Sequence, residues 1–395
     1  MKRYILVHYG EIALKKANKP FFVEKLRKAL KYRLKQRFHV SFSAKHTLGR
    51  FMIELPDNFD EERYADVIGK ISGIQNYKFV FLGPIDIKKL SEQIWQNMPS
   101  YVLDELTAPK NFKVSVKRSM VMPLKSFEMA RDIGAALIER GLSVPVKLNN
   151  PEFVVDVEFF NNGAYFSYKK YPGIGGFPPN SQSKLVALIS SGIDSPVAAY
   201  KMMKKGARII FVHFHGYPYT DQDEMDQVRD LVKILSAYQF DTKLYLVPFG
   251  QVQRAIATNL QVPGKLRTVL YRRIMLKIAE QIARDEKAKG LLTGDSFGQV
   301  ASQTPHNIFA IHDASTIPLF QPLISLDKEE IIKIAEKIGT FEISKLPCKD
   351  TCTMFTPKKA EIKANLRDVR NYEKNLPVHE WIEKVLDEAE IINFN

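Results

Sequence analysis

The spacing of apolar residues predicts a first series of strands and helices in the front part of the chain. Residues 19–36 carry apolar side chains at Phe22, Leu26, Leu30 and Leu34, which is the repeat of an amphipathic helix. Short apolar runs predict strands at residues 4–8, 38–43 and 51–55 and a further helix at 59–68. This βαββα order is typical of a small α+β unit of ferredoxin-like type, which we expect over residues 1–72.

A second alternation of strands and helices predicts another compact α/β unit over residues 73–170. The predicted elements are strands at 78–81 and 112–118, helices at 86–98 and 126–140, and a hairpin of 154–160 with 164–169. The hairpin turn is Asn161-Asn162-Gly163, a sequence that suits a tight turn. Residues 171–183 are rich in Gly, Pro and polar side chains, so we expect an exposed linker there.

Strands alternate with helices again over residues 184–357. An apolar run begins at Leu185, and further strands are predicted at 208–214, 243–248 and 290–293, with helices at 196–205, 223–237, 252–260, 267–284 and 328–338. This alternation predicts an α/β fold with a doubly wound parallel sheet, whose ligand lies at the carboxyl ends of the strands. Residues 358–395 are expected to form a helical extension that packs on a neighbouring element or on a second subunit.

The first of these strand ends carries the candidate chemistry. The strand runs into residues 190–195 and then into a helix, which brings backbone N–H groups and the positive end of a helix dipole to one point. Such a point binds phosphate. The same residues could simply cap the helix, with Asp194 or Ser195 as the N-cap and Pro196 as the first helical residue. Neither GxxxxGK[ST] nor GxGxxG occurs here, so the local sequence leaves the two interpretations about even.

Two other strand ends carry polar residues. His213, Phe214 and His215 end the second strand, and the two histidines face the same side of it. They lack a convincing third metal ligand, so we favour a role in packing or in contact with the edge of a bound nucleotide. The fourth strand leads into TGDSFGQVASQT, residues 293–304. This loop could be a plain turn capped by Asp295, but its position favours contacts with ribose or adenine.

Composition narrows the class of protein and its compartment. The 395 residues are 45% hydrophobic and 26% charged, which is typical of a globular protein with room for two or three domains. Two cysteines fit a reducing compartment. Neither a membrane-length apolar run nor a secretory leader is recognisable. We therefore expect a cytoplasmic protein that does not associate with a membrane.

Positive charge is concentrated in the front half. Residues 1–183 contain 29 Lys and Arg against 18 Asp and Glu, a net charge of +11, whereas the remainder carries only +3 of the total of +14. A solvated basic surface needs no partner, but this concentration favours a polyanion-binding module joined to a less charged catalytic module. Nucleic acid is the leading candidate for the partner.

Several motifs in order resemble one family of enzymes. The chain contains YGEIALKKANKPFF, GGFPPNSQSK, ISSGIDSPVA, VHFHGYPYT, YRRIM and TGDSFGQVASQT, and up to about residue 357 it resembles the tRNA 4-thiouridine synthetases, the tRNA uracil 4-sulfurtransferases. ISSGIDS is similar to the SGGxDS loop of PP-loop ATP pyrophosphatases of the adenine nucleotide alpha hydrolase-like fold, with Ser191 where that family usually has Gly. VKLNNPEFVVDVEFF resembles part of a THUMP domain, which implies RNA binding by residues 73–170.

The resemblance implies a site for ATP with Mg²⁺ and a surface for tRNA. Asp194 is expected to be catalytic and to organise Mg²⁺ with ATP. The residues expected to bind ATP are Ser190, Ser191, Gly192, Ile193, Ser195, His213, Phe214, His215, Arg272, Gly294, Asp295 and Gln303. The residues expected to bind tRNA are Lys15, Lys16, Lys19, Lys117 and Arg118.

Two cysteines lie in SKLPCKDTCTMFTP. They could belong to a metal site, but structural zinc would need two further ligands. They could also be two half-buried cysteines with a purely structural role. The resemblance makes Cys352 the catalytic, sulfur-carrying residue, with Cys348 as a possible second sulfur-transfer cysteine. Lys345 and Lys349 nearby would favour a thiolate.

The implied reaction makes 4-thiouridine at position 8 of tRNA. ATP adenylylates the uridine C4 oxygen, and persulfide sulfur then displaces AMP. Longer members of the family append a rhodanese domain, which we expect to be absent here. A cysteine desulfurase is the expected sulfur donor, and a homodimer is the expected assembly.

Three other classes of protein share some of these sequence features. Other PP-loop tRNA thiolation enzymes usually carry CxxC pairs, which this sequence lacks, and a small-molecule amidotransferase would not need the basic front half or the late cysteine. A non-catalytic tRNA-binding protein with a vestigial ATP site is the rival from another class, suggested by Ser191.

Overall fold

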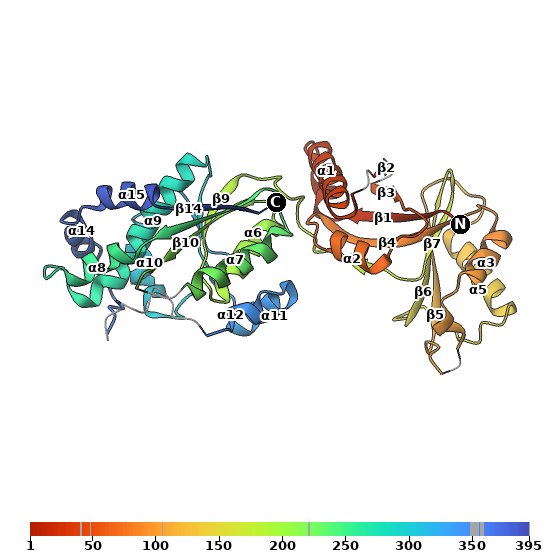
Figure 1. The fold of residues 1–395 in the computed structure, drawn as a ribbon. Coiled ribbons are helices and arrows are strands. Elements are labelled where there is room, and N and C mark those ends of the chain that lie inside the picture. The colour runs from red at the N-terminus through yellow and green to blue at the C-terminus, as the bar shows by residue number, and fades with distance from the viewer. Residues whose placement is uncertain are drawn as a thin grey trace. The chain divides into compact units, whose positions relative to one another are not determined.

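The computed structural model describes residues 1–39, 42–47, 49–104, 106–219, 222–347, 355 and 359–394. The chain forms two compact units, Met1–Pro178 and Pro179–Asn395 (Figure 1). Each unit is built around a sheet of its own.

The first unit contains an eight-stranded sheet with the order β2-β3-β1-β4-β7-β6-β5, in which β8 also pairs with β4. Its elements are β1 (Arg3–Tyr9), η1 (Glu11–Leu14), α1 (Lys19–Phe38), β2 (Ala44–Thr47), β3 (Arg50–Glu54), α2 (Glu61–Gly69), β4 (Ile74–Gly83), α3 (Ile87–Gln96), α4 (Ser100–Leu103), β5 (Phe112–Arg118), α5 (Ser126–Glu139), β6 (Phe153–Phe160), β7 (Gly163–Ser167) and β8 (Tyr171–Pro172). The strand β4 pairs with β1 and, through its last three residues, with β7. This one strand therefore joins the predicted ferredoxin-like unit and the predicted α/β unit into a continuous sheet.

The core of the first unit follows the predicted apolar pattern. Phe22, Leu26, Leu30 and Leu34 are all buried on α1, as their spacing predicts. A second apolar cluster lies between the helices α3 and α5 and the strands β5, β6 and β7. The hydrophobic periodicity was therefore sufficient to identify α1, α2, α3 and α5, whereas the one-turn helix α4 was not predicted.

The predicted strand at residues 38–43 was wrong. Helix α1 continues to Phe38 and ends at His39, whose φ of 56° is left-handed and whose N–H bonds the Lys35 carbonyl at 2.8 Å. The Phe38 ring stacks on Tyr64 of α2 with centroids 3.8 Å apart. This tertiary contact stabilises a helical end where the local sequence favoured a strand.

The boundary between the two units falls after Pro178, inside the predicted linker 171–183, but residues 171–175 pack on β4 and are not the exposed segment that we expected. The strand β8 pairs with β4, and Gly173 and Gly175 donate backbone hydrogen bonds to Gln75 and Ile74 at 2.9 and 2.8 Å. A Cβ on Gly173 would lie 2.2 Å from the Ile74 carbonyl oxygen. The glycines therefore allow the segment to approach β4 closely and do not mark a solvated linker.

A buried ionic cluster lies within the first sheet. Glu158 of β6 is 2% exposed and faces Lys78 of β4 at 3.0 Å, Arg50 of β3 at 2.8 Å and His8 of β1 at 3.4 Å. Burial by itself raises the pKa of Glu158. The contact with His8 and the charges of Lys78, His8 and Arg50 outweigh burial and lower that pKa to about 2.

Glu158→Gln should destabilise the first unit by about 3 kcal/mol, because Arg50 loses its buried carboxylate and Lys78 keeps only Asp156, at 3.2 Å. The folded pKa of Glu158 lies below the ordinary value of 4.5, so its stabilisation is present above pH 4.5 and is lost as the pH falls toward 2. Denaturant unfolding at pH 7 and pH 3 tests both statements. Equal stability of the variant and the wild type at pH 7 would contradict them, and Glu62→Gln, at an exposed site on α2, is the control.

The second unit contains a six-stranded sheet with the order β13-β12-β9-β10-β11-β14. Its elements are β9 (Lys184–Leu188), α6 (Asp194–Lys204), β10 (Arg208–His215), α7 (Asp223–Ser236), β11 (Thr242–Pro248), α8 (Gly250–Thr258), η2 (Gly264–Leu266), α9 (Arg267–Asp285), β12 (Leu291–Leu292), η3 (Ala301–Gln303), α10 (Pro305–His312), β13 (Leu319–Phe320), α11 (Lys328–Ile338), α12 (Phe341–Ser344), α14 (Leu366–Lys374), α15 (Val378–Asp387) and β14 (Glu390–Phe394). Five strands are parallel, and β14 is antiparallel to β11. The predicted doubly wound parallel sheet is confirmed.

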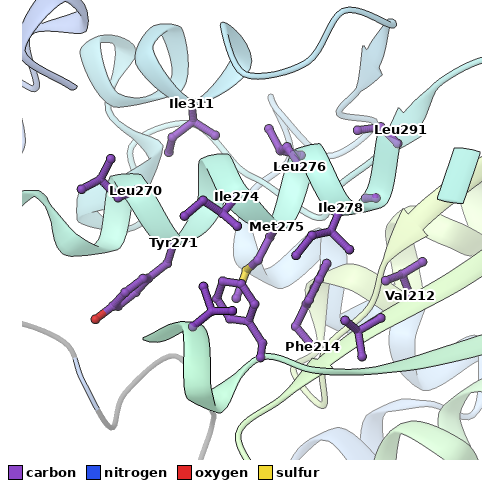
Figure 2. Packing of buried hydrophobic residues seen from close by; sticks show 14 of the residues in the cluster. Val212, Phe214, Leu270, Tyr271, Ile274, Met275, Leu276, Ile278, Leu291 and Ile311 are labelled. Carbon is purple, nitrogen blue, oxygen red and sulfur yellow. The ribbon is translucent and has the colours of Figure 1, made fainter. Parts of the chain in front are cut away.

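The long helix α9 is central to the core of this unit. Its apolar side chains meet Val212 and Phe214 of β10, Leu291 of β12 and Ile311 of α10 (Figure 2). Because Tyr271, Arg272 and Met275 lie on the same helix, this packing also fixes one wall of the cavity described below.

The C-terminal residues pack within the second unit. Val369 of α14 and Val385 of α15 are buried in the same apolar cluster as α9, and β14 extends the sheet at its edge beside β11. The expected helical extension is therefore two helices followed by a strand. Among the described residues, no helix is long and apolar enough to cross a membrane.

Candidate active site

The loop between β9 and α6 is closed by a serine side chain. The Ser190 N–H donates to the Ser195 hydroxyl oxygen at 2.9 Å, and that hydroxyl lies 3.3 Å from the Ser190 carbonyl oxygen and 3.2 Å from its hydroxyl. These contacts close residues 190–195 into a compact loop that leads into the first turn of α6. Serines at the two ends of the motif thus hold the loop in shape.

The start of α6 favours a phosphate loop over a simple cap. The N-cap is Ile193, which has no capping side chain within the described part of the chain, and Asp194 is already helical. The backbone N–H groups of the first turn therefore face the loop without a side-chain acceptor in the N-cap position. Ser191 is buried, and its φ is not positive, so Ser in place of the usual Gly causes no backbone strain there.

The loop after β12 touches the start of α6 directly. A Cβ on Gly294 would lie 2.7 Å from the Ser195 nitrogen and 2.9 Å from the Asp194 carbonyl carbon. Only glycine allows these two backbones to approach so closely. The TGDS sequence therefore joins the two strand ends into one site.

Gly294→Ala should weaken ATP binding by about tenfold or more, equivalent to about 1.4 kcal/mol, because the added methyl group must push this loop away from α6. Calorimetric titration of ATP tests it. Gly264→Ala is the matched control, because its Cβ would meet only the end of Arg267 at 3.9 Å. Unchanged ATP affinity in the Gly294 variant would show that the close approach does not shape the site.

Asp295 is buried at the centre of a network of donors. It accepts hydrogen bonds from Arg272 at 2.5 Å and Thr293 at 2.7 Å, and from Gln303 at 3.2 Å and Gln321 at 3.1 Å. Burial by itself raises its pKa, but the Arg272 guanidinium and these hydrogen bonds outweigh burial and lower that pKa. Asp295 is therefore a carboxylate that holds Arg272 in place.

His213 is buried with one ring nitrogen engaged. Its Nδ1 lies 3.0 Å from the Ile189 carbonyl oxygen, so Nδ1 carries the proton and donates. Burial is the main cause that lowers the pKa of His213, to about 4. The ring is therefore neutral near pH 7.

These elements surround a cavity of about 490 Å³. The predicted residues that line it are Ser190, Asp194, Ser195, His213, Phe214, Arg272, Gly294, Asp295 and Gln303. The structure thus brings together residues from four separate segments. Ser191, Gly192, Ile193 and His215 do not contribute to this lining within the described residues.

Asp194 has two polar partners that sequence reasoning missed. Lys328, the first residue of α11, donates to Asp194 Oδ1 at 2.6 Å, and Gln299 approaches Oδ2 at 3.4 Å. Lys328 lies 134 residues from Asp194. The capping box of α11 at Asp327 and Glu330 could have located the helix start, but no local pattern pairs it with Asp194.

Other lining residues were also missed. Thr268, Tyr271 and Met275 lie along α9 beside Arg272, and Glu224 comes from the first turn of α7. Apolar side chains on a helix are usually core residues, so their spacing carried no signal for a cavity.

The predicted cysteines, Cys348 and Cys352, lie outside the described residues. Two described residues, Ser344 before the cysteines and Phe355 after them, contact the loop 190–195 and the cavity wall. Ser344 approaches the Gly192 carbonyl oxygen at 3.4 Å, and Tyr271, which lines the cavity, donates to the Phe355 carbonyl oxygen at 3.3 Å.

The predicted tRNA-binding residues all lie in the first unit. Lys16, Lys117 and Arg118 are exposed. The Lys15 ammonium lies 4.8 Å from the Phe177 ring centre, and Arg118 donates to the Leu124 carbonyl oxygen at 2.7 Å, so these two also support local structure.

Among the residues that the structure describes, no group of three or more His, Cys, Asp or Glu side chains could hold a metal ion by itself.

Family models match most of the chain. Residues 180–378 match the Thiamine biosynthesis protein (ThiI) family, residues 4–77 match the ThiI ferredoxin-like domain, and residues 86–169 match the THUMP domain. The "Probable tRNA sulfurtransferase" of Thermus thermophilus is 37% identical over 396 residues, covering 100% of this chain and 95% of that protein. The protein of the same name from Acetivibrio thermocellus is 36% identical over 394 residues, with 99% of each chain covered.

Solved structures agree with this relationship. The crystal structure of a 4-thiouridine synthetase–RNA complex with bound ATP is 30% identical, with a TM-score of 0.88 over 100% of both chains. PH1313 from Pyrococcus horikoshii is 20% identical, with a TM-score of 0.65 over 86% of this chain and 100% of that one, and shares the fold. One family model matches residues 180–378, and relatives more than 30% identical align over 99–100% of this chain. The chain therefore belongs to the ThiI family.

Proposed function

We propose that this protein is an ATP-dependent tRNA sulfurtransferase that makes 4-thiouridine at position 8 of tRNA. The observation that carries the proposal is the single cavity in which the Ser190–Ser195 hydrogen bonds, the Asp194–Lys328 pair and the Asp295–Arg272 pair meet. One protein of known structure, which is 30% identical to this chain, is a 4-thiouridine synthetase in complex with RNA and with bound ATP.

The charges and the apolar lining of this cavity suit ATP. The phosphates would lie at residues 190–195, where backbone N–H groups and the dipole of α6 favour negative charge. Arg272 adds a fixed cation, because Asp295 and Ser302 hold its guanidinium. The apolar side chains of Phe214, Met275 and Leu276 offer a surface for the adenine ring.

The first chemical step would activate the target base. The uridine C4 oxygen attacks the α-phosphorus of ATP, a P–O bond breaks, and pyrophosphate leaves. Mg²⁺ suits this site, because it is usually held by one or two carboxylates together with phosphates, and Asp194 lines the cavity beside the loop. When bound it would neutralise charge on the phosphates. Lys328 holds the Asp194 carboxylate in position for that role.

Sulfur would then replace the activated oxygen. The terminal sulfur of a Cys352 persulfide attacks C4, the C4–O bond breaks, and AMP leaves. The Cys348 thiolate attacks the Cys352 sulfur, which releases 4-thiouridine and forms a Cys348–Cys352 disulfide that an external dithiol reduces. Cys352 is three residues from Phe355 in the sequence. Phe355 is bonded to the cavity-lining Tyr271, which supports Cys352 as the donor.

The proposed reaction also needs a surface for tRNA and a sulfur donor. Lys15, Lys16, Lys19, Lys117 and Arg118 of the basic first unit would contact tRNA phosphates, so affinity for tRNA should fall steeply with salt. A cysteine desulfurase would supply the persulfide sulfur, a homodimer would be the working assembly, and the cytoplasm would be the compartment.

Pyrophosphate release tests the activation step. Purified protein, ATP and an unmodified tRNA transcript should release pyrophosphate, and a transcript with cytidine at position 8 is the control. With a sulfur donor added, mass spectrometry of the digested tRNA should detect 4-thiouridine. Absence of pyrophosphate release, with tRNA binding intact, would favour the rival interpretation of a non-catalytic tRNA-binding protein.

A further inference from the structure

An exposed aromatic ring lies on the loop at the edge of the cavity. This rim loop, residues 296–300, connects Asp295, which lies in the cavity wall, to the segment 301–303, which also lines the cavity. The side chain of Phe297 in the rim loop is 61% exposed, and that of Val300 is 53% exposed. A large ring left in water beside a reaction site suggests that something else covers it during the reaction.

The backbone beneath this ring is firmly held. The Phe297 N–H donates to the Ile324 carbonyl oxygen at 3.1 Å, and the Ser296 hydroxyl lies 3.3 Å from the Leu326 carbonyl oxygen. The Gly298 N–H donates to the Gln303 carbonyl oxygen at 2.9 Å. The ring therefore stands on an ordered support, which reduces the entropy cost of binding a partner to it.

The rim loop also touches the catalytic carboxylate. Gln299, two residues beyond Phe297, approaches Asp194 Oδ2 at 3.4 Å, and Val300 lines the cavity itself. Phe309 of α10 is as exposed as Phe297, at 66%, and neither ring is part of the cavity lining, but Phe309 lies outside the rim loop. Position, and not exposure alone, therefore distinguishes Phe297.

We propose that the target uracil stacks on Phe297 when it enters the site. This inference rests on the proposed function, because that reaction requires the C4 oxygen to reach the α-phosphorus of ATP. A base that is stacked within folded RNA cannot reach an atom inside a protein cavity, so enzymes that modify bases extrude the target nucleotide and hold it against apolar or aromatic side chains. An aromatic ring is a suitable support, because every base has a π-face.

Kinetics with tRNA test this role. Phe297→Ala should lower kcat/KM for tRNA in pyrophosphate release by about tenfold to a hundredfold, while KM for ATP stays the same. Phe297→Tyr and Phe297→Trp should retain most of the activity, because they keep a ring. Phe309→Ala is the matched control and should equal the wild type. Wild-type kinetics for Phe297→Ala, or an equal loss in Phe309→Ala, would overturn the proposal.

A binding measurement separates this inference from the proposed function. A tRNA transcript with the fluorescent base pyrrolocytosine at position 8 should lose fluorescence on binding to the wild type, and Phe297→Ala should remove that quenching. If the wild type releases no pyrophosphate but the quenching still depends on Phe297, the proposed function fails and the stacking role stands. If pyrophosphate release is normal and the quenching is the same in both proteins, the stacking role fails and the proposed function stands.

Discussion

Cys352→Ser should abolish the formation of 4-thiouridine while pyrophosphate release from ATP and tRNA continues. The serine oxygen cannot carry a persulfide, so thiolation should fall by at least about 10³-fold. The activation step uses the cavity residues and ATP, so it should proceed at nearly the wild-type rate and leave adenylylated tRNA to accumulate. Quantifying 4-thiouridine by mass spectrometry and pyrophosphate by a coupled assay, in the same reaction, checks both halves.

Cys348→Ser is the matched control, since the chain has only these two cysteines. After incubation with a cysteine desulfurase, intact-protein mass spectrometry should detect an additional sulfur atom on Cys348→Ser and none on Cys352→Ser. Multiple turnovers should stop in Cys348→Ser if that thiol resolves the intermediate, whereas the first turnover should remain. Full thiolation by Cys352→Ser would remove Cys352 from the mechanism.

Asp194→Asn should reduce tRNA-dependent pyrophosphate release by about 10²–10³-fold, because the amide keeps the shape of the side chain but removes its charge. Lys328→Met should reduce it as well, because Asp194 then loses its partner at 2.6 Å. If the two side chains act as a unit, the double variant should be little worse than Asp194→Asn, and this non-additivity distinguishes a coupled pair from two independent residues.

Affinity for tRNA should stay unchanged in all three variants, because the basic surface proposed to bind it lies in the first unit. Glu329→Gln, at the exposed neighbour of Lys328, is the control for charge removal at the start of α11. A large loss of tRNA binding in Asp194→Asn would contradict the division of labour between the units. Additive losses in the double variant would show that Lys328 acts on something other than Asp194.

Periodicity and turn chemistry determined most elements of this protein. The strand β5 and the helix α11 begin and end where their apolar patterns predict, and the four apolar positions of α1 are buried. The alternation in the second half determined the parallel sheet, which brings the ends of β9, β10 and β12 to one edge. Residues 190–195 and 293–296 could therefore be predicted to share a site, because neighbouring parallel strands end together.

Contacts between distant segments could be decided only by the tertiary structure. Lys328 reaches Asp194, and Gln321 reaches Asp295, through packing of α11 and of the loop before it against other elements. Position 173 must be glycine because any Cβ there would collide with the carbonyl oxygen of Ile74, about a hundred residues earlier in the chain. The sequence around Gly173 resembles a linker and does not reveal this contact. The C-terminal strand β14 joins β11 through backbone hydrogen bonds. Local sequence sets which elements form, because helix and strand periods depend on neighbouring residues. It does not determine which side chains meet, because burial and hydrogen bonding between distant segments depend on the whole fold.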